Sequence, residues 1–289
     1  MANGRLLFID LLRIAGISLV LGEHIVSSGL YPFLMKYYLS ISLYGNMVYI
    51  TYGRIGVAIF LFASGCSLAN SNSEIRTFKD IKEFYSKRLL RIYPAYWTAI
   101  LFSIMMEPYI LLRSFSCLEI FKYLIGFQAW GAKNGLEALG KINGPFWFLT
   151  PLLSLYIMYP LILYLIKKRP NLSLISFLVV SEISTYLLLH YYTTEPSWSP
   201  LYWLFIFGFG MYVMKVSLYP KMKNNTKAIV FLSNMVFYVY LINEPLDFTI
   251  LQYPILFFVA LFVIASMFYA FDKQIHNLMS RNKPKLSPS

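Results

Sequence analysis

The sequence of 289 residues is poor in charge, in cysteine and in histidine. Charged residues make up only 13% of it, about half the share found in soluble domains. Its two cysteines, Cys66 and Cys117, are too few for a disulfide framework. Its three scattered histidines form no ligand cluster, so no metal site is predicted. The chain also lacks internal repeats and low-complexity tracts, which indicates one domain without a soluble module.

Apolar residues take the place of charge and make up 58% of the chain. A helix that crosses a membrane needs about 20 predominantly apolar residues. Eight stretches approach this length, at 6–30, 47–70, 89–112, 144–166, 172–190, 201–216, 228–243 and 250–270. The sequence therefore predicts an all-α, polytopic transmembrane helical bundle of about eight helices. Residues 1–272 would form the membrane domain and 273–289 a basic cytoplasmic tail.

Lysine and arginine are distributed unequally between the two sets of loops. Counted alternately, the loops on one side carry 17 basic residues. The other side carries five, namely Lys36, Arg113, Lys122, Lys133 and Lys141. By the positive-inside rule both termini are predicted to be cytoplasmic. The net charge of +12 is then explained by topology and anionic lipid, without a nucleic-acid partner. The segment 114–130 is predicted to lie at the outer interface as an amphipathic helix.

The first predicted helix carries an arginine and a histidine in an apolar setting. Arg13 and His24 are eleven residues apart, so they share a helix face and lie about 16 Å apart along the axis. Ionisable groups inside a bilayer are costly, which favours a functional path through the membrane. The alternative is an arginine that snorkels to the interface and a histidine packed among its neighbours.

Two further sets of arginines are candidates for function. Arg88 and Arg91 lie on neighbouring turns of the third helix, where their forked donors could bind one polyanion. The alternative is an ordinary basic membrane anchor. Arg54 begins the second helix at about the depth of His24. It could stabilise negative charge developing on an oxygen, or pair with Glu23.

Several of these strings, in order along the chain, resemble the acyltransferase-3 family of polytopic membrane enzymes. The first helix is similar to the family's opening pattern through Asp10, Arg13 and His24. The other resembling strings are GVAIFLFASG at 56–65, KRLLRIYPAYW at 87–97, FWFLTPLLSLYIMYP at 146–160 and YVYLINEP at 238–245. The family usually has a glutamate at the position of Leu152 and a histidine at that of Asn243. It usually has two more helices between Met214 and Ala228.

The resemblance implies an O-acyltransferase that moves an acyl group, acetyl above all, from cytoplasmic acyl-coenzyme A. The acceptor would be a hydroxyl of a cell-surface glycan or a lipid-linked molecule. Arg13, Arg88 and Arg91 would hold the coenzyme, as co-substrate and not as a resident cofactor. His24 and Arg54 are the predicted catalytic residues. Contacts to the acceptor are predicted for Glu23, Trp147 and Asn243.

Two other classes of protein fit parts of the same sequence. An intramembrane file of arginine, histidine and glutamate would also suit a transporter or flippase for lipid-linked or acylated molecules. The absence of an internal repeat counts against this class. A non-catalytic relative of the family would explain Leu152 and Asn243. Both the enzyme and the non-catalytic relative should bind coenzyme, whereas a transporter should not. Turnover then separates the enzyme from the non-catalytic relative.

Overall fold

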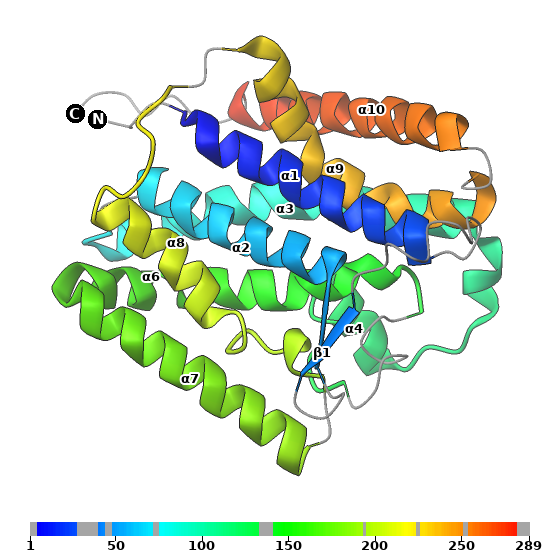
Figure 1. The fold of residues 1–289 in the computed structure, drawn as a ribbon. Helices are drawn as coiled ribbons and strands as arrows, with labels where there is room; N and C mark the ends of the chain where they lie inside the picture. The colour runs from blue at the N-terminus through cyan, green and yellow to red at the C-terminus, as the bar shows by residue number, and fades with distance from the viewer. Residues whose placement is uncertain are drawn as a thin grey trace.

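The computed structural model describes residues 5–27, 40–43, 48–71, 75–132, 141–192, 195–223, 226–250 and 254–281. These residues form a helical bundle with one small β-hairpin (Figure 1). The long helices are α1 (Leu7–Ser27), α2 (Tyr52–Ser71), α3 (Phe78–Met106), α6 (Leu149–Lys168), α7 (Pro170–Tyr191), α8 (Leu204–Lys215), α9 (Lys227–Ile250) and α10 (Pro254–Arg281). The shorter elements are β1 (Ser40–Leu43), β2 (Val48–Thr51), η2 (Pro108–Leu112), α4 (Cys117–Ile125), η3 (Gly144–Phe148) and η4 (Pro196–Trp198).

The prediction of a helical membrane protein is confirmed. Among the described residues, five helices are long and apolar enough to cross a membrane. They are Tyr52–Ser71, Phe78–Met106, Gly144–Lys168, Pro170–Tyr191 and Leu256–Gln274. Each of the eight predicted stretches contains a helix, but α8 has only 12 residues. The count of eight spans and the orientation of the termini stay predictions. The end of the bundle at which α1 begins is called the inner end below, and the opposite end the outer end.

Large apolar side chains on α7 and α10 point away from the bundle. Ile175, Val179 and Ile183 of α7 are all exposed, and so are Val259 and Phe262 of α10. The two helices form opposite flanks of the bundle (Figure 1). Since exposed apolar surface of this extent is unfavourable in water, these faces are suited to lipid.

The structure corrects three local predictions. Helix α3 begins at Phe78, well before the predicted 89, because Thr77 and Asp80 form a capping box. Residues 48–51, predicted to be helical, form strand β2, which pairs in antiparallel register with β1. Helix α10 continues past residue 272 to Arg281, so the first part of the predicted tail is helical. Lys36, Lys133 and residues 282–289 lie outside the described residues.

Close contacts between glycines hold α2 against its neighbours. A Cβ atom on Gly56 would lie 2.6 Å from the carbonyl oxygen of Gly16 in α1. On another face of α2, a Cβ atom on Gly65 would lie 2.2 Å from the carbonyl oxygen of Phe207 in α8. Glycines therefore let the backbones of α1, α2 and α8 approach closely, as is common in membrane helix packing. Helix α9 packs against α1 on the side away from α8 (Figure 1).

The predicted amphipathic segment contains helix α4, which lies near the outer end of the bundle (Figure 1). Tyr123 faces inward and is buried, whereas Leu118, Phe121 and Leu124 are exposed. At the start of this helix, Glu119 binds Lys141 and the cap residue Ser116. These partners lower the pKa of Glu119 to about 2, with the hydrogen bond from Lys141 as the largest cause. The contacts join α4 to the segment that leads into η3.

Candidate active site

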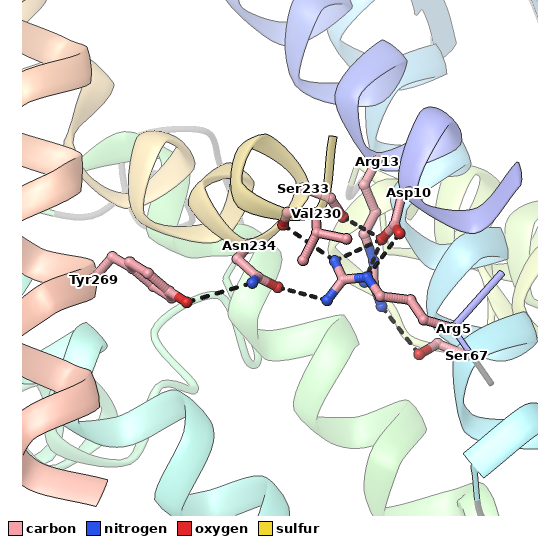
Figure 2. A network of polar contacts seen from close by, with 8 residues as sticks. All are labelled: Arg5, Asp10, Arg13, Ser67, Val230, Ser233, Asn234 and Tyr269. Atoms are coloured by element: carbon pink, nitrogen blue, oxygen red, sulfur yellow. Dashed lines mark hydrogen bonds and ion pairs between the residues drawn. The ribbon is translucent and has the colours of Figure 1, made fainter. Parts of the chain in front are cut away.

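A polar network connects α1 to α9 near the inner end of the bundle (Figure 2). Asp10 is only 1% exposed and accepts hydrogen bonds from Nε and Nη2 of Arg5, both at 2.7 Å. The hydroxyl of Ser233 in α9 donates to the same carboxylate at 2.6 Å. Arg5 also donates to Oδ1 of Asn234 at 3.0 Å. A buried carboxylate with several donors is a stable arrangement, and here it fixes the position of α1 relative to α9.

Arg13 lies one turn after Asp10 and extends toward α2. Its Nη1 atom is 3.7 Å from Oδ1 of Asp10, and its Nη2 donates to the hydroxyl of Ser67 at 3.0 Å. The first distance is too long for a hydrogen bond, so only charge attraction connects Arg13 to Asp10. Arg13 therefore has weaker compensation from this carboxylate than Arg5 has.

Arg13, Arg88 and Arg91 line one cavity of about 110 Å³. Hydroxyl and amide side chains from α2 and α9 also line its polar part, and the other part is apolar. Arg88 lies with its Cζ atom 5.7 Å from the ring centre of Phe84. Its buried Nε atom has no hydrogen-bond partner among the described residues. The three arginines that were predicted to act together therefore line the same cavity. Their binding of a coenzyme stays a prediction.

A second, wider cavity of about 530 Å³ lies next to the first, toward the inner end. Arg13, Arg91 and Phe237 line both. The described charged residues around the two cavities are five cations and two carboxylates, namely Arg5, Arg13, Arg88, Arg91, Lys273, Asp10 and Asp272. The net charge of these groups is therefore positive, which favours an anionic ligand with more than one negative charge.

Three aromatic rings lie at the apolar end of the first cavity. Phe60 comes from α2, Phe148 from the end of η3 and Tyr240 from α9. Their ring centres are 6.4 Å (Phe60 to Phe148), 6.2 Å (Phe60 to Tyr240) and 5.3 Å (Phe148 to Tyr240) apart. Each ring thus contacts the other two at ordinary packing distances. The three residues are called the aromatic triangle below.

His24 lies beyond the aromatic triangle, in the last turn of α1. The single helix predicted to carry both Arg13 and His24 is confirmed, since α1 runs unbroken from Leu7 to Ser27. His24 is half-buried and is not among the described residues that line the arginine cavities. Its neighbour Glu23 accepts a hydrogen bond from the backbone N–H of Gly53 at the start of α2. This contact satisfies a helix N-terminus and fixes the outer end of α1 against α2.

A similar contact holds α9 to η3 at the outer end. Glu244 accepts a hydrogen bond from the backbone N–H of Gly144. The preceding residue, Asn243, is 0% exposed, and its amide donates to the carbonyl oxygen of Tyr240 at 2.9 Å. The Oδ1 atom of Asn243 has no hydrogen-bond partner among the described residues. Trp147 is half-buried beside Ala129 and Ala132.

Arg54 turns toward α7 and α8. Its Nη1 atom forms an ion pair with Oε1 of Glu195 at 3.0 Å. With Glu182 of α7, Arg54 lines a third cavity of about 270 Å³. Arg13 and Arg54 therefore line different cavities, and His24 is not among the described residues lining either. The predicted role of Arg54 in stabilising an oxyanion stays a prediction.

The sequence did not indicate several residues that shape this site. No motif marks Arg5, although two of its nitrogen atoms donate hydrogen bonds to Asp10. Ser233 and Asn234 have no motif that would connect them to residues more than 220 positions earlier. The aromatic triangle likewise combines residues from three distant segments. For the polar network, the sequence offered one signal, namely the spacing of Asp10 and Arg13 in the first helix.

Comparison with known proteins gives one finding. A family model described as an acyltransferase domain, of the acyltransferase-3 type, matches residues 6–284. No curated protein and no solved structure matches the chain significantly.

Proposed function

Because the chain belongs to the acyltransferase-3 family, we propose that it moves an acyl group from cytoplasmic acyl-coenzyme A to a hydroxyl group. The acceptor would be a cell-surface glycan or a lipid-linked molecule, and the acyl group acetyl. The chain is a multi-pass membrane protein, and we place it in the cell membrane. The family supports acyltransferase activity in general, whereas the donor, the acceptor and the membrane are part of the proposal.

The positive charge around the two cavities carries this proposal. Coenzyme A has several phosphate groups, and arginine binds phosphate through paired donors. Arg13 and Arg91 line both the wide and the narrow cavity. The phosphates would lie in the wide cavity near these residues, with Arg88 further in. The acylated pantetheine arm would then enter the narrow cavity and extend toward the outer end.

The proposed reaction takes place at His24. A neutral imidazole can accept a proton. It would take the proton of the acceptor hydroxyl as the oxygen attacks the thioester carbonyl. A carbon–oxygen bond forms, and the carbon–sulfur bond then breaks. The proton passes to the thiolate, which leaves an ester and free coenzyme A. Transfer in this way does not require the coenzyme itself to cross the membrane.

The outer residues would bind the acceptor or stabilise the transition state. Trp147 could stack on an apolar sugar face, and the buried Oδ1 of Asn243 could accept a hydrogen bond from an acceptor hydroxyl. Glu23 would act by holding the last turn of α1, since its carboxylate binds Gly53. Arg54 would act on the oxyanion while paired with Glu195. An Arg54→Gln variant that keeps full turnover would contradict this last role.

The first test uses membranes that contain the wild type or the His24→Ala variant. Acetyl-coenzyme A labelled in the acetyl group is supplied, and label is followed into lipid and glycan fractions. We expect transfer by the wild type and none by the variant, with coenzyme binding retained in both. Binding without transfer from several acyl donors would indicate a non-catalytic relative. No binding of coenzyme would favour a transporter.

A further inference from the structure

The aromatic triangle separates the arginine cavities from the outer end of the bundle. Phe60 is seven residues from Gly53, which binds Glu23, and seven from Ser67, which binds Arg13. Phe60 is therefore about 10 Å along α2 from each of these two contacts. On α9, Tyr240 likewise follows Asn234 of the inner network and precedes Glu244 of the outer end. The rings thus lie between the proposed coenzyme site and His24.

The rings leave little space between them. All three are at least nine-tenths buried, and their centres are 5.3–6.4 Å apart. Protein interiors are close-packed, so a group can pass between these rings only if at least one of them moves. The required movement increases with the size of the group that passes. A contact of this kind discriminates by bulk.

The surroundings of each ring indicate which of them can move. The hydroxyl of Tyr240 donates to the carbonyl oxygen of Pro145 at 2.6 Å, which holds this ring from one side. Phe60 lies against the α1 backbone, with a ring atom 3.1 Å from the place of a Cβ atom on Gly16. Neither phenylalanine can form a hydrogen bond through its ring. Opening therefore falls mainly to Phe148, since Phe60 is restricted by the α1 backbone beside it.

We propose that Phe60, Phe148 and Tyr240 select the acyl group by size as it passes from the arginine cavity toward His24. The inference rests on the proposed function, because it presupposes that acyl-coenzyme A is the donor. It adds a substrate class, since slim unbranched acyl groups pass and wide acyl groups, such as those that carry a ring, are excluded. It also assigns a role to three residues outside the predicted catalytic and coenzyme-binding sets.

The test compares donors whose acyl groups differ in width, in membranes that contain the full chain. Coenzyme A carrying a labelled acetyl, butyryl or phenylacetyl group is supplied, and the initial rate of label transfer is measured. We expect the wild type to use the wide phenylacetyl group at least about tenfold more slowly than acetyl, since even single methylene groups can give such discrimination. Phe148→Ala and the milder Phe60→Leu should each raise the phenylacetyl-to-acetyl ratio about tenfold or more.

A control separates selection from general damage. Phe258 is an exposed phenylalanine of α10, and Phe258→Ala should keep the wild-type ratio. Equal use of acetyl and phenylacetyl by the wild type would overturn the inference alone. An unchanged ratio in both triangle variants, at normal levels of folded protein, would do the same. No transfer by the wild type from any donor would overturn the proposed function, and the inference with it.

Discussion

Asp10 is bound by Arg5 more closely than by Arg13. Two nitrogen atoms of Arg5 lie 2.7 Å from the carboxylate oxygens of Asp10. The Nη1 atom of Arg13 is 3.7 Å from the same carboxylate. The carboxylate therefore compensates Arg5 first, and the charge of Arg13 is directed to the cavity that it lines. One acid in this way both holds the inner end of the bundle together and leaves positive charge for a ligand.

Replacement of Asp10 by asparagine should destabilise the protein. The change leaves Arg5 and Arg13 without this counter-ion in a largely buried network, at a cost of about 3 kcal/mol. Thermal unfolding in detergent should show a lower midpoint. Glu83→Gln is the control, because Glu83 pairs with Lys87 at 2.6 Å in an exposed position. That pair should contribute less than about 1 kcal/mol. Equal stability of the Asp10→Asn variant and the wild type would contradict the role of the network.

Replacement of Arg13 by alanine should weaken the binding of acetyl-coenzyme A. A hydrogen bond to a charged group contributes about 1.5–3 kcal/mol, which corresponds to a loss of about tenfold to a hundredfold in affinity. Calorimetric titration of the purified protein measures the change, and the wild-type affinity should fall with added salt. Lys79→Ala removes an exposed inner charge and should leave the affinity within about twofold. Similar losses in both variants would point to unspecific attraction.

Replacement of Gly65 by alanine should disrupt the contact between α2 and α8. The added Cβ atom would lie 2.2 Å from a backbone oxygen, so the two helices must separate. We expect a loss of about 1–3 kcal/mol in the free energy of unfolding. Gly22 is a matched control in α1, because a Cβ atom there meets nothing within 4 Å. Gly22→Ala should be neutral or stabilise the helix by up to about 1 kcal/mol. Chemical unfolding in detergent compares the two.

The stability of α4 should depend on pH through Glu119. Its pKa falls from 4.5 to about 2 in the folded protein, so its contribution is complete above pH 4.5. The contribution is lost as the pH falls toward 2, because the folded state must then bind the proton. Hydrogen exchange of residues 117–125 should show a stronger acid dependence in the wild type than in Glu119→Gln. Parallel pH profiles of the two proteins would exclude this contribution.

Local sequence patterns predicted the parts of the fold that depend on local chemistry. Apolar stretches located the eight long helices, and the spacing of Arg88 and Arg91 placed them on one side of α3. Hydropathy placed the start of α3 too late, because its first turns carry charge. The capping residues Thr77 and Asp80 were the better signal there. The strand at 48–51 was not predicted, because it belongs to the same apolar stretch as the helix α2 that follows it directly.

The parts that the sequence did not predict depend on contacts between distant helices. The chain has 24 phenylalanines and 24 tyrosines, and nothing local distinguishes Phe60, Phe148 and Tyr240 from the others. The contact between Glu23 and Gly53 joins residues 30 positions apart, and no local pattern indicates it. The ion pair between Arg54 and Glu195 likewise joins distant segments of the chain.

The bond between Arg5 and Asp10 also bears on how the chain enters the membrane. Arg5 and Asp10 are translated more than 220 residues before Ser233 and Asn234. Helix α1 therefore brings a counter-ion for its buried carboxylate from its own N-terminal side. Asp10 can enter the membrane already paired with Arg5, and α9 completes the network afterwards.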